Sequence, residues 1–319
     1  MIINDWDPAF TKKYGTEFPR SYLCVDTEFT GSNEQDDLIL EIGHTMIEDG
    51  KIVDELNVVL DWYPTKHVQE SWLDYKLNTM RHNVGTGWRL TPAVVRQEGM
   101  DPIKALKFYY KLFAAWSARG LPFVAQNGMT ADERLLRGNF NRFLGKPFAF
   151  PENGYFDTGG LYKANRIWSS SEDNLMAVRG TMLPHRSDTL KAYFHRVIYT
   201  RCAGVKWNMK AILDEYNLRE KHKLRDDQFH TAGFDSKCLH YIMEEFRKEV
   251  KPTSENVTSP VQTLGDGVAK QEDYEKAMAT YRRQDKQAKS KAAQEEPKIN
   301  TPAAPRKKGK KRKRKQRLI

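Results

Sequence analysis

The chain has 319 residues, of which 39% are apolar and 29% charged, and its formal net charge is +10. The apolar and aromatic content is sufficient for a folded core, which excludes wholesale disorder, and every apolar run is far shorter than the roughly 20 residues of a membrane-spanning helix. Three cysteines without CxxC spacing exclude a disulfide scaffold and a cysteine-rich zinc module, and with an acidic N-terminus in place of a secretory signal they predict an intracellular protein with no membrane partner.

The excess positive charge lies at the C-terminal end. Residues 251–319 contain 19 Lys and Arg against 8 Asp and Glu, whereas residues 1–250 contain 33 against 34. Large apolar residues become rare beyond Phe246, so this segment buries too little apolar surface to offset its conformational entropy. The sequence therefore predicts one folded domain over 1–250 and a disordered Lys/Arg-rich tail over 251–319, with only a transient helix around 272–291.

Three strand-like runs open the folded part. Ser21 to Thr27, Leu38 to Ile47 and Ile52 to Leu60 are rich in apolar and β-branched residues, which is typical of strands. The turn signal Glu48-Asp49-Gly50-Lys51 joins the second and third runs. The opening is therefore predicted to be an antiparallel meander.

Helices and short strands alternate after the meander. The first helix is predicted from Asp101-Pro102 to about Arg119, because an N-cap residue and a proline begin it and Gly120 ends it. The further predictions are a strand at Leu121 to Ala125, a helix at Ala131 to Leu144, a strand at Tyr155 to Asp157, and helices at Asn208 to Tyr216 and Gly233 to Lys248. Asp157-Thr158 is interpreted as a helix cap. This order predicts an α/β fold in which helices flank a mixed β-sheet.

Two carboxylates stand at the end of the first predicted strand. Asp26 and Glu28, in Cys24-Val25-Asp26-Thr27-Glu28-Phe29, point to the same side because side chains alternate along a strand. If both are buried they repel each other, and their pKa values rise unless a cation holds them together. The alternative is a solvated strand end.

A third carboxylate is predicted at the start of the helix that follows Phe123-Val124-Ala125-Gln126-Asn127. Asp132 aligns with the buried stripe of this helix, whose other members are Leu136, Phe140 and Phe143. Glu133 is predicted on the solvent side, where it can pair with Arg137 four residues later. Asp132 is therefore the acid predicted to point inward.

A fourth carboxylate opens the last predicted helix. Asp235 precedes Leu239, Ile242 and Phe246 by four, seven and eleven residues, which places it on the core-facing stripe, and Lys237 points elsewhere. His230 lies five residues before it in the preceding loop. The alternatives are an Asp that complements the helix dipole and an ordinary hydrogen-bonded loop histidine.

Taken together and in this order, these motifs resemble the DEDDh 3'-5' exonucleases, relatives of the polymerase proofreading exonuclease with a ribonuclease H-like fold. The resemblance covers roughly residues 20–248 and includes Glu41-Ile42-Gly43 and Asn208 to Leu213. It implies a ribonuclease H-like mixed sheet flanked by helices. The middle motif departs from the family pattern: Gln126 replaces a His, the spacing to Asp132 is one residue longer, and Ala131 replaces a Phe.

The resemblance also implies a catalytic site. The family's metal ligands fall on Asp26, Glu28, Asp132 and Asp235, and its general base falls on His230. Four carboxylates balance the charge of two Mg²⁺ or Mn²⁺ ions, which prefer oxygen ligands and can clamp the attacking and leaving oxygens of a phosphodiester. A neutral His230 could take a proton from the attacking water, because the reference pKa of histidine is about 6.5.

Three more residues are predicted to hold the terminal nucleotide. The resemblance places Phe29 where this family stacks a base, although a core role for Phe29 is an equal alternative. The backbone amides around Thr27 and Glu28 and the side chain of Asn127 are the other candidate contacts.

These observations predict a metal-dependent 3'-5' exonuclease that acts on the 3' end of single-stranded or frayed nucleic acid, either DNA or RNA. The alternatives are an exoribonuclease that trims RNA 3' ends and a non-catalytic nucleic-acid-binding protein that retains the fold. The stretches 61–100 and 167–207 contain basic residues among aromatic ones, which suits either single-strand contacts or surface insertions with their own apolar clusters. Arg306 to Arg317 has ten basic residues in twelve and is interpreted as a nucleic-acid arm, a nuclear localisation signal or both, so the expected location is the cytoplasm or the nucleus.

Overall fold

A computed structural model describes residues 18–85, 87–182, 189–202 and 204–249 of this chain. The predicted tail at 251–319, its transient helix and the basic cluster Arg306 to Arg317 lie outside the described residues. Among the helices within these ranges, none is both long and apolar enough to cross a membrane.

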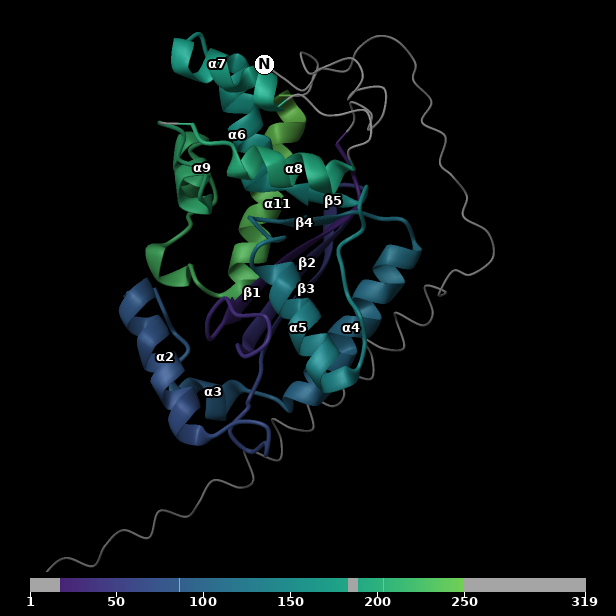
Figure 1. Ribbon diagram of the computed structural model, residues 1–319, viewed down its shortest axis with the longest axis vertical. Coiled ribbons are helices and arrows are strands. Elements are labelled where there is room, and N and C mark those ends of the chain that lie inside the picture. The colour runs from purple at the N-terminus through teal and green to yellow at the C-terminus, as the bar shows by residue number, and fades with distance from the viewer. Residues whose placement is uncertain (1–17, 86, 183–188, 203, 250–319) are drawn as a thin grey trace, which may run out of the picture. The chain divides into compact units, whose positions relative to one another are not determined.

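A mixed five-stranded sheet forms the centre of the fold (Figure 1). Its strands are β1 (Tyr22–Phe29), β2 (Ile39–Glu48), β3 (Lys51–Val59), β4 (Phe123–Ala125) and β5 (Tyr155–Asp157). They lie in the order β3-β2-β1-β4-β5. β2 is antiparallel to both β1 and β3, whereas β4 is parallel to β1 and β5 is parallel to β4. The predicted meander and mixed sheet are therefore confirmed.

The helices match the predicted boundaries where the sequence carries caps and regular apolar spacing. They are α2 (Glu70–Val84), α3 (Pro92–Glu98), α4 (Pro102–Ala118), α5 (Asp132–Leu144), α6 (Thr158–Ser169), α7 (Asp173–Met182), α8 (Leu190–Tyr199), α9 (Met209–Glu215), α10 (Leu218–Lys221), the 3₁₀ helix η2 (Asp226–Gln228) and α11 (Ala232–Glu249). The side chain of Asp101 caps α4, and the side chain of Asp157 accepts a hydrogen bond from the Gly160 amide and caps α6 as predicted.

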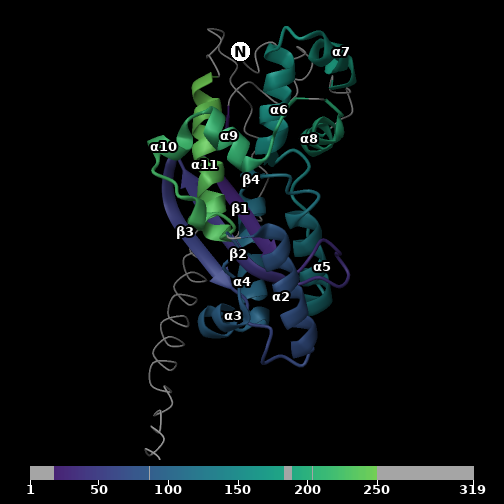
Figure 2. The ribbon, with the colours of Figure 1, turned by 90° about the vertical axis from the view of Figure 1, so that its left-hand side faces the viewer.

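Helices cover both faces of the sheet (Figure 2). On one face, Thr45 of β2 and Ser236 of α11 share a hydrogen bond of 3.0 Å. On the opposite face, Tyr109 of α4 donates its hydroxyl hydrogen to the Ile42 carbonyl over 2.9 Å and packs against the ring of His44. The fold is therefore α/β with helices on both sides of a mixed sheet, as the sequence predicts.

The stretches 61–100 and 167–207 form helices that the sequence did not predict. Trp62 and Trp88 are buried, and their indole N–H groups donate to the carbonyls of Ile39 and Leu90 over 2.7 and 3.0 Å. These two tryptophans are therefore core residues and not base contacts. In α8, Tyr193 and Phe194 are also buried, and the Phe194 ring packs against Phe156 of β5. α8 is therefore part of the core of the domain.

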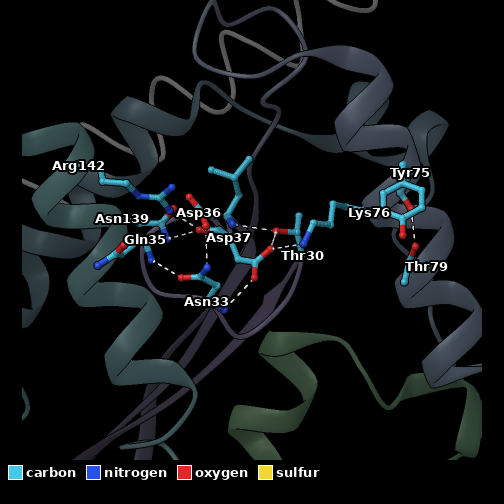
Figure 3. Close-up of polar contacts among 11 residues, drawn as sticks. Thr30, Asn33, Gln35, Asp36, Asp37, Tyr75, Lys76, Thr79, Asn139 and Arg142 are labelled. Carbon is cyan, nitrogen blue, oxygen red and sulfur yellow. Dashed lines mark hydrogen bonds and ion pairs between the residues drawn. The ribbon is translucent and has the colours of Figure 1, made fainter.

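A buried aspartate holds the connection between β1 and β2 (Figure 3). Asp37 accepts hydrogen bonds from the Thr30 hydroxyl at 2.9 Å, the Asn33 amide at 2.8 Å and the Lys76 ammonium at 2.8 Å. Its carbonyl accepts from side chains of α5, of which Asn139 lies at 3.2 Å. The chain that leaves β1 is therefore fastened to both α2 and α5.

Candidate metal centre

The first two predicted acids lie on the face of the sheet that α11 covers. In the β1–β2 register Asp26 lies opposite Gly43 and Glu28 lies opposite Glu41, and side chains of paired residues share a face. Glu28 is 9% exposed and Glu41 is fully buried. The prediction that Asp26 and Glu28 point to the same side of β1 is therefore confirmed. A further carboxylate, Glu41, lies beside them on β2.

Side chains from β2 and β3 hold the N-terminus of α11. Glu41 Oε2 accepts a hydrogen bond from the Ala232 amide at 3.1 Å, and Asn57 Oδ1 accepts one from the Gly233 amide at 2.7 Å. Gly43 allows this approach, because a Cβ atom there would lie 2.0 Å from the carbonyl carbon of Ala232. The first amides of α11 are thus capped by the sheet.

This N-terminus places the histidine and the last predicted acid. His230 has a φ of 61°, in the left-handed region, and its amide donates to Asp235 Oδ2 at 3.0 Å. Asp235 is 7% exposed, and its other oxygen, Oδ1, is buried without a hydrogen-bond partner among the described residues. Lys237 points away, as predicted, and binds Glu55 at 2.9 Å.

Three of the predicted residues form one group. Ligand atoms of Glu28, His230 and Asp235 all lie within 4.8 Å of one another. Within this group His230 Nδ1 is 4.0 Å from Glu28 Oε1, and the imidazole is 47% exposed. Asp26 and Asp132 are not members of this group.

Asp132 approaches the site from the start of α5. It is 3% exposed, and its Oδ1 accepts a hydrogen bond from the Thr27 hydroxyl at 2.6 Å. The loop before it is anchored by buried Asp157, which also accepts from the Tyr155 hydroxyl at 2.6 Å and from the amides of Asn127 and Gly128. The irregular middle motif therefore still directs Asp132 towards β1.

The prediction that Glu133 lies on the solvent side is wrong. Glu133 is 3% exposed and pairs with Lys191 of α8 at 2.7 Å, in addition to the predicted ion pair with Arg137 at 3.9 Å. The physical reason is that Lys191, near the start of α8, reaches Glu133, and the sequence did not predict α8. Glu133 therefore binds α8 through Lys191 and is not a member of the group of Glu28, His230 and Asp235.

The three predicted substrate contacts differ in their burial and in their contacts with the rest of the protein. The side chain of Thr27 is buried and bonded to Asp132, whereas Phe29 is only partly buried. Asn127 is also partly buried and has a φ of 55°. Left-handed residues outside glycine are uncommon and concentrate at functional sites, and this chain places two of its candidate residues, Asn127 and His230, in that conformation.

The electrostatics of the site disfavour the charged forms of four carboxylates. Burial, followed by the charges of the neighbouring acids, raises the pKa of Asp26 and the pKa of Glu28 well above their usual range. The Arg89 guanidinium acts in the opposite direction on the pKa of Glu28. Burial also raises the pKa of Asp132 and that of Asp235 to about 7 each, against hydrogen bonds that stabilise their charged forms.

These residues fit a hard divalent cation. The donor set consists of carboxylate oxygens and one imidazole, without a thiolate, and such ligands suit Mg²⁺ or Mn²⁺. The unpaired Oδ1 of Asp235 and the mutual repulsion of the acids are both relieved by a bound cation. Burial lowers the pKa of His230, so its imidazole is neutral near pH 7.

No protein-family model matches this chain, and no curated protein matches it. Among solved structures, E. coli exonuclease I in complex with a dA16 oligonucleotide is similar with a TM-score of 0.46 and 13% identity, over 72% of this chain and 41% of that chain. A second exonuclease I structure gives a TM-score of 0.45 at 14% identity, over 73% and 42%. A product-bound exonuclease I gives 0.44 at 12% identity, over 72% and 44%. This chain thus spans less than half the length of these exonucleases.

Sequence reasoning missed the polar residues that support the centre. The motif Glu41-Ile42-Gly43 contains one of them, Glu41, but predicts no contact for it, and no motif marks Asn57 or Arg89. The available signal was a carboxylate in the apolar run Ile39 to Ile47, since a buried acid requires a partner. Its partners lie 16 and 48 residues later in the chain, so the sequence alone did not identify them.

Proposed function

We propose that residues 1–250 form a metal-dependent 3'-5' exonuclease domain that hydrolyses phosphodiester bonds at the 3' end of single-stranded or frayed nucleic acid. The observation that carries this proposal is the convergence of buried carboxylates with raised pKa values around an unpaired oxygen, Asp235 Oδ1, beside a neutral histidine. Pairs of titratable groups with strongly perturbed pKa values are typical of catalytic centres.

Asp26, Glu28, Asp132 and Asp235 are the residues that would hold two Mg²⁺ or Mn²⁺ ions. When bound, such ions neutralise the charge that develops on the phosphate and favour deprotonation of the attacking water. The four acids would fix where these ions lie, because each acid is itself held in place. Asp26 and Glu28 are held by β1, Asp235 by the His230 amide, and Asp132 by Thr27.

His230 is proposed as the general base. Its Nδ1 faces Glu28, at the group where the attacking water would lie, and the neutral imidazole can accept a proton at this atom. His230→Ala is expected to lower turnover about 10²- to 10⁴-fold, the usual contribution of general-base catalysis, with little change in calorimetric Mn²⁺ affinity. A loss of affinity as large as the loss of rate would make His230 a ligand instead.

The substrate end is proposed to lie against the C-terminal end of β1. Phe29 is the candidate stacking surface for the last base, and the backbone around Thr27 and Glu28, with Asn127, is the candidate contact to its sugar and phosphate. A 3' end bound there would lie over the group of Glu28, His230 and Asp235.

The deciding experiment is digestion of end-labelled single strands of DNA and RNA of one sequence, with Mg²⁺, with Mn²⁺ and with EDTA. Release of mononucleotides from the 3' end, lost with EDTA and in Asp26→Ala and Asp235→Ala, would support the proposal. Binding without hydrolysis of either strand would favour a non-catalytic nucleic-acid-binding protein. Hydrolysis of the RNA strand alone would assign the alternative exoribonuclease activity.

A further inference from the structure

The segment between α2 and α3 contacts the candidate centre at two points. Gly87 is the first: a Cβ atom at this position would lie 2.9 Å from Cδ2 of the His230 imidazole. Arg89 is the second: its guanidinium forms an ion pair with Glu41, whose side chain is fully buried. The two contacts lie two residues apart: one is with His230, just before α11, and the other is with Glu41, which caps the Ala232 amide.

Glu41 is the residue through which Arg89 can act on α11. One carboxylate oxygen, Oε1, accepts from Asn57 and Arg89, and the other, Oε2, accepts from the Ala232 amide. A fully buried carboxylate without a cation would be strongly disfavoured. If Arg89 is removed, Glu41 loses the cation that holds its carboxylate in place, which weakens its hold on the amide of Ala232.

Arg89 also spans the surface and the interior. Its second terminal nitrogen binds the exposed Glu98 of α3 at 2.8 Å, and the Arg89 side chain is 28% exposed. The guanidinium therefore joins the inserted helices to the sheet at the point where α11 begins. A fork of this shape can bind two carboxylates at once, which a lysine ammonium on its single stem does less well.

We infer that Arg89 is a positioning residue of the centre, which acts through Glu41 to fix the first turn of α11 and with it His230 and Asp235. This inference rests on the proposed function where it concerns turnover, whereas its structural part does not. The segment 61–100 then has two roles: it contributes two tryptophans to the core, and through Arg89 it positions residues of the candidate centre.

The test compares full-length Arg89→Met and Arg89→Lys with a matched control in the same inserted segment. Arg96→Met removes another α3-side cation, which binds the exposed Glu70 at 3.2 Å and the ring of Tyr63 and lies outside the centre. Two readouts do not require activity: amide hydrogen exchange along α11 in the metal-free protein, and calorimetric affinity for Mn²⁺ alone. The third readout is kcat and KM on an end-labelled single strand.

Arg89→Met is expected to speed exchange at Ala232 about 10- to 100-fold, as expected for loss of a hydrogen bond to a charged acceptor, while exchange at Ile242 in the middle of α11 stays as in the wild type. Mn²⁺ affinity or kcat is expected to fall about 10- to 100-fold, the usual effect of losing a residue that supports a ligand, with KM nearly unchanged. Arg89→Lys should fall between Arg89→Met and the wild type, and Arg96→Met should match the wild type in all three readouts.

Unchanged exchange at Ala232 in Arg89→Met would overturn the inference. Faster exchange with unaltered Mn²⁺ affinity and kcat would also overturn it, because the helix end would then not govern the centre. A wild-type protein that binds Mn²⁺ but cleaves neither DNA nor RNA would refute the proposed function, and the exchange and Mn²⁺ readouts would still decide the role of Arg89.

Discussion

The candidate centre is built from residues in states that are unfavourable by themselves. His230 and Asn127 have left-handed backbone conformations, and Asp26, Glu28, Asp132 and Asp235 are carboxylates whose pKa values burial raises. Such states persist only where neighbouring contacts hold them. In this chain the contacts are identifiable: Thr27 for Asp132, the His230 amide for Asp235, and Arg89 for Glu41.

The raised pKa values of Asp132 and Asp235 predict a pH dependence of stability in the metal-free protein. Their folded-state pKa of about 7 lies above the value of about 3.9 for an unfolded aspartate. At these two residues the folded state therefore binds more protons, so the stability that they contribute is fully present below pH ~4 and is lost as the pH rises through 7.

Mg²⁺ or Mn²⁺ competes with these protons and is expected to raise the melting temperature more at pH 7.5 than at pH 5.5. Thermal melts of the metal-free and metal-loaded protein at both pH values check this. Asp132→Asn and Asp235→Asn should each reduce the difference between the two pH values. An equal effect of the metal at pH 5.5 and pH 7.5 would contradict the assignment of these acids as ligands.

Gly87 gives a second prediction at the scale of single residues. A methyl group in Gly87→Ala would meet the imidazole of His230 at 2.9 Å, and because the contact is with the end of a side chain, the ring can turn away at little cost in stability. A displacement of about 1 Å at a catalytic group can cost about 10²-fold in rate, so kcat should fall while the melting temperature hardly changes.

Gly85→Ala is the matched control for Gly87→Ala. Gly85 has a φ of 86° and open space around its Cα, so alanine there strains the backbone without touching His230. It should lower the melting temperature and leave kcat close to the wild-type value. The reverse pattern in the two variants would show that Gly87 does not place the imidazole.

At the scale of elements, buried charges dock the helices that the sequence did not predict. Lys191 attaches α8 to Glu133 of α5, and Lys76 attaches α2 to Asp37 between β1 and β2. In the sequence, Glu133 directly follows Asp132, and Asp37 precedes Glu41 by four residues. Each of these two helices is therefore bound to a segment that also carries a residue of the candidate centre or its support.

The first two residues of α5 are expected to differ in role, with Asp132 as a proposed metal ligand and Glu133 as the partner of Lys191 in α8. Asp132→Asn is expected to reduce nuclease turnover roughly 10³-fold, because a metal ligand contributes several kcal/mol to stabilisation of the transition state. Glu133→Gln should keep turnover near the wild-type value but lower the free energy of unfolding by about 1–3 kcal/mol, since Lys191 loses its charged partner. Rate assays and thermal melts on both variants check this, and an inactive Glu133→Gln beside an active Asp132→Asn would make Glu133 the catalytic acid.

Elements with strong local signals were predictable from the sequence. β5 and the ends of α4 and α5 agree with prediction to within a residue or two, because alternation, caps and terminal glycines define them. α2 was missed because only Leu73 and Leu77 form its buried stripe, which is too sparse for a helical period to stand out. The same limit applies to the centre: Asp26, Glu28, Asp132, His230 and Asp235 stand in recognisable motifs, whereas the partners of Glu41 lie 16, 48 and 191 residues away in the chain.

At the scale of the whole molecule, charge divides along the chain. Residues 1–250 are close to neutral and the net positive charge belongs to residues 251–319, so we expect long-range attraction to nucleic acid to come mainly from the tail. If the tail contacts about 6 phosphates of a single strand, the slope of log K against log salt is about −4, at roughly 0.7 per phosphate.

Removal of residues 304–319 should then weaken binding of long substrates and flatten the salt dependence. The single-turnover rate on a saturating short oligonucleotide should hardly change, because none of the proposed ligands is removed. Binding titrations of the full-length and truncated protein at several salt concentrations check this. Superimposable salt slopes would assign the tail to localisation or to a protein partner.

The cap that the sheet places on α11 has a consequence for synthesis of the protein. Glu41 is made 191 residues before Ala232, the amide that it binds, and the group of Glu28, His230 and Asp235 includes residues from both ends of the domain. On the ribosome, β1 to β3 emerge early, and their acids have neither His230 nor Asp235 beside them until the last helix has left the exit tunnel. Translation therefore completes this centre only with the final helix of the domain, and a nascent chain that stops before residue 230 carries the acids of β1 without His230 or Asp235.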